Sequence, residues 1–198
     1  MSFRIMSPFR ELPNEILWEH YDNEYGYLNV AEKTILDIGA DVGTSSDYWL
    51  QHGAAKIFAI EGYKPSYDQL IKNIEEQHWE NIITPEQMWI CDTAQFSYLL
   101  NKYGYADICK IDCEGCEKYW LELEDEVISI PNIYIIEFHR QEYLEKGTER
   151  LLKLGYILEN RVEVTYDVCV VLFRKQGKAS LFNSVYSKTK IIFKDLCH

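Results

Sequence analysis

Short apolar runs alternate with helical patterns from residue 34 onward. Five runs have the length and composition of strands: Thr34–Ile38, Lys56–Ile60, Met88–Cys91, Ala106–Ile111 and Asn132–Phe138. Between them, apolar residues recur at helical spacing, as Tyr67, Leu70, Ile71 and Ile74 do at i, i+3, i+4 and i+7. Strands that alternate with helices predict βαβ units and a parallel sheet.

The end of this pattern changes character. Tyr156–Glu163 and Tyr166–Arg174 are two strand-like runs with only a short turn between them. We expect them to pair as an antiparallel hairpin. The sequence therefore predicts an α/β fold with a mostly parallel seven-stranded sheet, an antiparallel C-terminal hairpin and helices on both faces. This arrangement resembles the single-domain, Rossmann-like class I methyltransferase fold, whereas ordinary nicotinamide-binding domains lack the closing hairpin.

The 198 residues suit one domain with flanking segments. We expect a partly helical N-terminal extension over residues 1–33, the main domain over 34–175 and a basic tail over 176–198. No apolar run is long enough for a transmembrane segment, and the N-terminus does not have the apolar block of a secretory signal. We therefore expect a cytoplasmic protein, and its oligomeric state is not predictable from the sequence.

The net charge of −12 argues against nucleic acid as the main partner. Binding to a phosphate backbone requires clustered Lys and Arg. Lysines gather only in the tail, where a partner or membrane surface is the alternative to simple solvation.

Six cysteines are present, and without an export signal we expect reduced, buried thiols, with disulfides as the alternative if the source is a hyperthermophile. Cys113 and Cys116 form a C-x-x-C, for which a redox pair and a zinc site are the alternatives. The neighbouring carboxylates of Asp112, Glu114 and Glu117 disfavour a reactive thiolate, and tetrahedral zinc would require further ligands. We therefore interpret both cysteines as packing residues.

Candidate cofactor ligands follow the predicted strands, because open parallel sheets bind ligands beyond the carboxyl ends of their strands. The first strand leads into Asp37-Ile38-Gly39-Ala40-Asp41-Val42-Gly43. Its glycines allow a tight turn against a ligand, and its spacing differs from the G-x-G-x-x-G of dinucleotide sites. A carboxylate such as Asp37 can accommodate the amino group of S-adenosylmethionine.

Acidic residues end the next two predicted strands. Glu61 is placed to accept hydrogen bonds from both ribose hydroxyls of a cofactor. Asp92 is a candidate for the adenine amino group, with a helix cap as the alternative.

Four motifs resemble those of the FkbM family of methyltransferases. They are D-x-G-A-x-x-G at Asp37, Gly39, Ala40 and Gly43, an acid with a nearby proline at Glu61 and Pro65, K-I-D-x-E-G-x-E at Lys110, Ile111, Asp112, Glu114, Gly115 and Glu117, and E-x-H at Glu137 and His139. The resemblance covers residues 34–175. It departs at Asp41, where the family usually has asparagine, and in the looser spacing from Glu61 to Pro65.

The resemblance implies an S-adenosylmethionine-dependent methyltransferase that acts on a hydroxyl of a sugar or other small-molecule or glycan acceptor. The cofactor-binding residues are then Asp37, Gly39, Ala40, Asp41, Gly43, Glu61, Asp92 and Asp112. A catalytically silent binding protein and a nucleotide-cofactor oxidoreductase are the other function classes left open.

The catalytic candidates are Asp112, Glu137 and His139, which end adjacent strands. An alcohol acceptor must lose a proton, so we expect one of them to act as a general base. Two alternatives stay open at the sequence level: Glu137 and His139 bond each other or cap loops, or the cluster holds a divalent cation.

Overall fold

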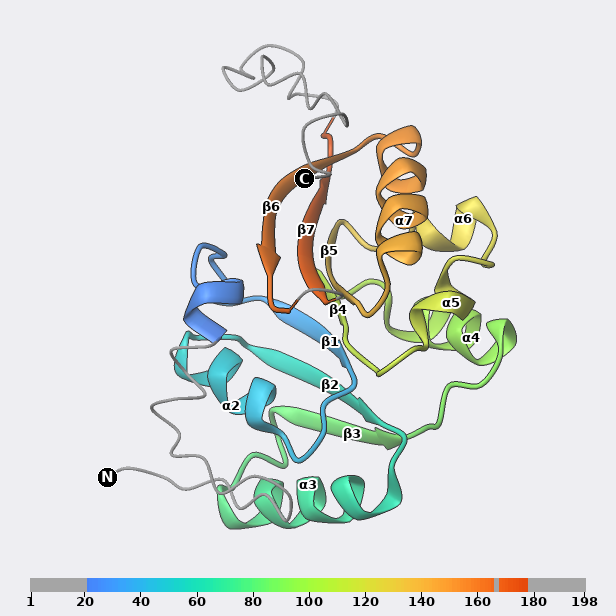
Figure 1. Cartoon of the computed structure of the whole chain (residues 1–198). Coiled ribbons are helices and arrows are strands. Elements are labelled where there is room, and N and C mark those ends of the chain that lie inside the picture. The colour runs from blue at the N-terminus through green and yellow to red at the C-terminus, as the bar shows by residue number, and fades with distance from the viewer. Residues whose placement is uncertain (1–20, 166–167, 178–198) are drawn as a thin grey trace.

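A computed structural model describes residues 21–165 and 168–177 of the chain. Seven strands form one sheet in the order β3-β2-β1-β4-β5-β7-β6 (Figure 1). The strands are β1 (Thr34–Ile38), β2 (Lys56–Glu61), β3 (Ile83–Gln87), β4 (Ile108–Ile111), β5 (Ile133–Phe138), β6 (Tyr156–Glu163) and β7 (Cys169–Lys175). The strands β1 to β5 are parallel, while β7 pairs antiparallel with both β5 and β6. The predicted sheet and its closing hairpin are confirmed.

Helices cover both faces of this sheet, as predicted. They are α2 (Thr44–Gln51), α3 (Lys64–Glu76), α4 (Thr93–Tyr103), α5 (Glu117–Trp120), α6 (Asp125–Ile128) and α7 (Gln141–Lys153). One apolar cluster joins the sheet to α2 and α3, and the other joins it to α4, α5, α6 and α7. The central strands β1 and β4 are almost wholly buried, because both of their faces pack against helices.

The third strand differs from the prediction. The strand is Ile83–Gln87, and the predicted segment Met88–Cys91 is a loop that follows it. The strand contains Pro85 and polar residues, so it does not form the apolar run by which the other strands were predicted. Proline is tolerated here because β3 is an edge strand, where a missing N–H breaks no inner ladder.

Part of the predicted N-terminal extension packs into the core. Tyr25, Leu28 and Val30 are buried in the cluster that contains α2 and α3. Residues 1–20, 166–167 and the tail from 178 onward lie outside the described residues. Among the residues that are described, every helix is too short or too polar to cross a lipid bilayer.

Candidate active site

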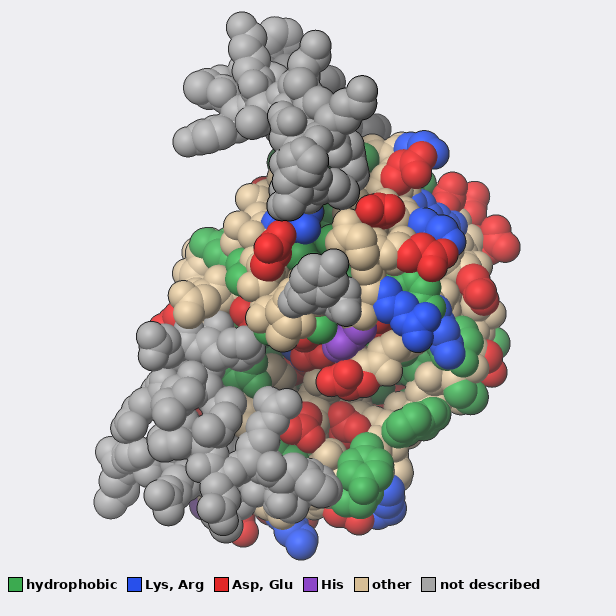
Figure 2. All heavy atoms as spheres, viewed as in Figure 1, with side chains coloured by type: hydrophobic (Ala, Val, Ile, Leu, Met, Phe, Trp, Pro, Cys, Tyr) green, Lys and Arg blue, Asp and Glu red, His purple; other side chains and the backbone are tan. Residues whose placement is uncertain are grey.

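A cavity of about 510 Å³ opens at the carboxyl ends of the parallel strands. Its walls include the segments that follow β1, β2, β3 and β4. The chain reverses its strand order between β1 and β4, where Ile38 pairs with Ile111. The cavity thus lies at the topological switch point, where α/β sheets bind ligands. Figure 2 shows acidic side chains gathered around a hollow on the viewed face.

The turn after β1 is held against two neighbouring strands. The N–H groups of Gly39 and Ala40 donate to the Ile60 carbonyl at 2.9 and 3.0 Å. Gly39 adopts φ +84°, and Asp41 also lies in the left-handed region at φ +50°. Both line the cavity, whereas Gly43 does not line it and precedes the first turn of α2. The backbone of Gly39–Asp41 therefore forms one wall of the cavity.

Glu61 ends β2 on the adjoining wall. Its carboxylate accepts hydrogen bonds from the backbone N–H of Asp41 at 2.8 Å and of Tyr63 at 2.6 Å. Burial raises the pKa of Glu61 above its ordinary value, and these two bonds oppose the shift. The contacts fix the side chain and leave lone pairs on both oxygens for a ligand.

Asp37 supports the site from beneath and does not line the cavity. It is fully buried and accepts hydrogen bonds from Ser45 Oγ at 2.6 Å and from Lys110 Nζ at 3.0 Å. Lys110 Nζ also donates to the Gly39 carbonyl at 3.1 Å and lies 3.3 Å from Asp112 Oδ2. Burial lowers the pKa of Lys110, but Asp37 and Asp112 outweigh it and hold that pKa above its ordinary value. The charged lysine therefore links the ends of β1 and β4.

The structure brings together the three catalytic candidates. One side-chain ligand atom each of Asp112, Glu137 and His139 lies within 4.8 Å of the others. Asp112 also lines the cavity, so this cluster adjoins the cavity through the end of β4.

Two carboxylates of the cluster share one environment. Burial and then the nearby Asp112 carboxylate raise the pKa of Glu137 to about 8. Burial would raise the pKa of Asp112 too, but Lys110 outweighs it and holds that pKa below its ordinary value. Like charges so close do not both ionise readily, so the pair retains one proton near neutral pH.

His139 is held by a buried carboxylate from α5. Glu117 Oε1 lies 3.2 Å from His139 Nδ1 and accepts from the His139 backbone N–H at 3.1 Å. The Glu117 hydrogen bond raises the pKa of His139 to about 9, against the effect of burial. Burial would raise the pKa of Glu117, but His139 holds it below its ordinary value. The imidazole is therefore cationic near neutral pH in the metal-free protein.

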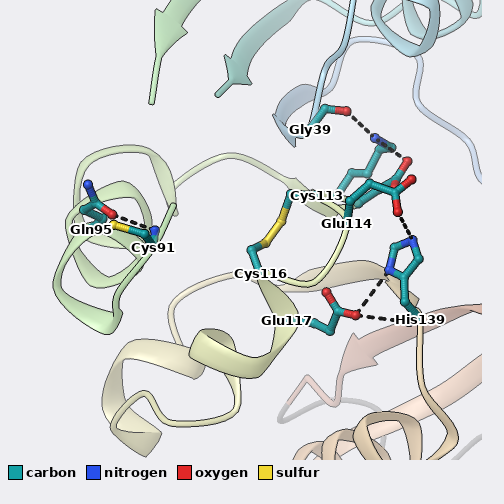
Figure 3. The surroundings of a disulfide bond; sticks show 10 residues. Gly39, Cys91, Gln95, Cys113, Glu114, Cys116, Glu117 and His139 are labelled. Carbon is teal, nitrogen blue, oxygen red and sulfur yellow. Dashed lines mark hydrogen bonds and ion pairs between the residues drawn. A yellow bond between two sulfur atoms is a disulfide. The ribbon is translucent and has the colours of Figure 1, made fainter. Parts of the chain in front are cut away.

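The cysteines of the C-x-x-C are joined by a disulfide, which corrects our expectation of reduced packing thiols. Cys113 and Cys116 face each other across the loop between β4 and α5 (Figure 3), with Cα atoms 5.5 Å apart. That separation is usual for a disulfide. The surrounding carboxylates disfavour a free thiolate but do not disfavour the oxidised pair. Cys109 and Cys169 are free and buried, as expected, whereas Cys91 is free and exposed.

Asp92 does not line the cavity. Its side chain accepts from the Gln95 N–H at 2.8 Å and caps α4. The cavity is lined instead by Met88, Trp89, Ile90 and Cys91 of the preceding loop. The prediction differs because it placed the third strand at Met88–Cys91, so that Asp92 directly followed its end, whereas the strand ends at Gln87.

Three contributions to the site were not predicted from the sequence. Lys110 and Glu117 stand in the matched motif, but without the fold no role could be read for either. Tyr21, whose hydroxyl lies 2.9 Å from Thr44 Oγ1, lines the cavity from a segment far from every motif.

Solved structures with a similar fold include methyltransferases. Precorrin-6y C5,15-methyltransferase of Geobacter metallireducens is 16% identical, with a TM-score of 0.55 over 88% of this chain and 93% of that one. Two fibrillarins also have TM-scores of 0.55. The Methanococcus jannaschii pre-rRNA processing protein is 15% identical over 79% of this chain and 77% of its own. The Aeropyrum pernix protein, with natively bound S-adenosylmethionine, is 14% identical over 80% and 74%. These likenesses confirm the predicted fold class.

No family model matches the chain, so the resemblance to the FkbM family stays a prediction. Two viral proteins are similar in sequence. Uncharacterized protein 65 of Sulfolobus islandicus filamentous virus is 37% identical over 107 residues, which are 52% of this chain and 58% of that protein. Uncharacterized protein 158B of Sulfolobus islandicus rod-shaped virus 1 is 34% identical over 144 residues, which are 71% of this chain and 82% of that protein. The chain belongs to the same family as protein 158B.

Proposed function

We propose that this chain is an S-adenosylmethionine-dependent methyltransferase. One observation carries the proposal: Glu61 and the Gly39–Asp41 turn form adjoining walls of the cavity at the switch point of the sheet. The carboxylate suits a ribose diol, and the turn admits a ligand close to its backbone. The fold shared with a fibrillarin that has natively bound S-adenosylmethionine supports the same cofactor.

The remaining walls suit the other parts of that cofactor. Thr44 and Ser45 begin α2 and line the cavity beside the glycine turn, where free N–H groups favour the methionine carboxylate. Tyr63 and Trp89 supply aromatic surface beyond Glu61, which suits the adenine ring. The sulfonium then lies toward Asp112, whose carboxylate favours a positive charge.

The cluster beside the cavity suits transfer to a hydroxyl. The acceptor oxygen forms a bond to the methyl carbon, the bond from carbon to sulfur breaks, and sulfur keeps the electron pair. Holding donor and acceptor in contact supplies most of the rate. Because the pKa of His139 is raised to about 9, the imidazole is a poor base near neutral pH. Glu137, with a pKa of about 8, also keeps its proton near neutral pH but loses it at a lower pH than His139 does, so as pH rises it is the first of the two able to accept the hydroxyl proton.

We infer that the acceptor is a small molecule or glycan and not a nucleic acid. The acidic cluster repels a phosphate backbone from the end of the cavity where the methyl would emerge. One fibrillarin neighbour is named for pre-rRNA processing, so RNA is the competing acceptor class. Methylation of RNA by the purified protein would overturn this inference about the acceptor and leave the cofactor proposal intact.

Calorimetric titration of the full chain with S-adenosylmethionine, S-adenosylhomocysteine and NAD tests the proposal. We expect the first two to bind and NAD not to bind. Glu61→Ala should weaken binding by about 1.5–3 kcal/mol, the range for hydrogen bonds to a charged group. Glu75→Ala, an exposed glutamate on α3, is the matched control and should bind like the wild type. Preference for NAD, or equal affinity in the Glu61 and Glu75 variants, would contradict the proposal.

A further inference from the structure

Side chains at the ends of two adjacent strands converge beside the cavity. Asp112 follows β4, Glu137 lies near the end of β5, and His139 follows β5. Their ligand atoms lie within 4.8 Å of one another. The exposed fractions of the Glu137 and His139 side chains are only 17% and 19%, so both side chains are largely shielded from solvent. Two carboxylates and an imidazole in this geometry form a common donor set for a divalent metal.

The imidazole is oriented independently of this cluster. Buried Glu117, on α5, holds His139 Nδ1 and the His139 backbone N–H with the same oxygen, Oε1. The ring therefore turns its other nitrogen, Nε2, toward Glu114 Oε2 at 3.3 Å (Figure 3). The same nitrogen lies 4.0 Å from Glu137 Oε1. A carboxylate on one ring nitrogen, with the other directed at further carboxylates, is the arrangement that orients metal-binding histidines.

The cluster also has more negative than positive charge. Lys110 forms ion pairs with both Asp37 and Asp112. His139 forms ion pairs with Glu114, Glu117 and Glu137. Five carboxylates thus meet one lysine and one histidine. Glu117 Oε2 is buried and has no hydrogen-bond partner among residues 21–165 and 168–177. Glu114 is 84% exposed, but the other four carboxylates are largely buried, and this much buried negative charge is costly without a further cation.

We propose that Asp112, Glu137 and His139 bind a divalent cation of the Mn²⁺ type, which accepts both oxygen and imidazole ligands. Each side chain offers one atom, His139 through Nε2. Three protein ligands would leave coordination positions open for water or an acceptor. The catalytic use of these positions rests on the proposed function: a metal held there would make a bound acceptor hydroxyl more acidic.

Manganese binding to the full chain tests the site without any acceptor. The protein is stripped with EDTA, dialysed and titrated with MnCl₂, and free Mn²⁺ is followed by electron paramagnetic resonance. We expect saturation at one ion per chain. Glu137→Gln keeps the shape of the side chain and should weaken binding by about tenfold or more, as metal-site substitutions typically do. Glu126→Gln, an exposed glutamate on α6, is the matched control.

Pulsed electron paramagnetic resonance of the ion bound to the wild-type protein supplies a readout that needs no variant to fold. Nitrogen modulation from an imidazole is expected in the wild type and should disappear in His139→Gln. Wild-type binding no tighter than that of Glu137→Gln, or a manganese spectrum without nitrogen modulation, would overturn the proposed ligand set. Calorimetry with S-adenosylmethionine on the same EDTA-treated protein separates the two proposals. Cofactor binding without manganese binding rejects only the metal site, and the reverse rejects only the methyltransferase.

Discussion

The carbonyl oxygen of Asp112 lies so close to Gly39 that a Cβ atom on residue 39 would stand 1.6 Å from it. The Asp112 N–H also donates to the Ile38 carbonyl at 2.9 Å. The turns that follow β1 and β4 therefore interlock, and this contact requires a residue without a side chain. The same contact presents both turns to one cavity.

Gly39→Ala should destabilise the protein more than Gly115→Ala. Both glycines have positive φ, at +84° and +103°, so each substitution incurs the left-handed cost of about 1–2 kcal/mol. A Cβ on Gly115 meets nothing within 4 Å, whereas one on Gly39 collides with Asp112. Overpacking should add about 1–3 kcal/mol at Gly39 alone. Urea denaturation measures both losses, and equal losses would show that the turns do not interlock.

Lys110→Met should lower the free energy of unfolding by about 3–5 kcal/mol, the usual cost of leaving a buried charge without its partner. The side chains of Lys110 and Asp37 are 2% and 0% exposed, so water cannot replace the lost contact. The double variant Asp37→Asn, Lys110→Met removes both charges and should recover part of the loss. Denaturation of the two single variants and the double variant completes the cycle. Strictly additive losses would mean that the pair is not coupled.

Local patterns carried the prediction of the parallel strands and of the residues at their ends. Gly39 and Glu61 directly follow or end buried strands, so their placement on one cavity needed only the rule for carboxyl ends of parallel strands. The strand Ile83–Gln87 was missed because an edge strand can be polar and contain Pro85.

Contacts between residues far apart in the chain could not be predicted from the sequence. Glu117 lies 22 residues from His139, and only the packing of α5 beside β5 joins them. The same limit applies to Lys110, whose motif position does not reveal that Asp37, 73 residues away, is its partner. The Cys113–Cys116 disulfide was visible as a spacing, but its oxidation state was not.

The metal-free protein should lose stability as pH rises through the range from about 6.5 to about 9. Its folded state holds the pKa of His139 at about 9 against an ordinary 6.5, so folding favours the bound proton. This contribution is complete below the ordinary pKa and is lost as pH passes the folded value. Glu137 acts in the same direction between its ordinary 4.5 and about 8.

The pH effect can be assigned with one variant. Denaturation in EDTA at several pH values should give a shallower decline for His139→Gln than for the wild type between about 6.5 and 9. Identical declines would remove His139 from the explanation.

Alkylation should distinguish the paired cysteines from the free ones. In the denatured, unreduced chain, Cys113 and Cys116 should resist alkylation, and their peptide should be lighter by two hydrogen atoms than after reduction. Cys109 and Cys169 are the internal controls and should be alkylated before and after reduction. Mass spectrometry reads all four sites. Complete alkylation of Cys113 and Cys116 before reduction would show that the pair is not a disulfide.

The most direct test of the central claim is the position of the ribose in a crystal of the protein with S-adenosylhomocysteine. The measurement is the distance from the two ribose hydroxyl oxygens to the Glu61 carboxylate. We expect both distances to be about 2.5–3.0 Å, the range for O–H···O hydrogen bonds, with the cofactor sulfur directed toward Asp112. A ribose bound away from Glu61, or a sulfur directed away from Asp112, would contradict the proposed methyltransferase site.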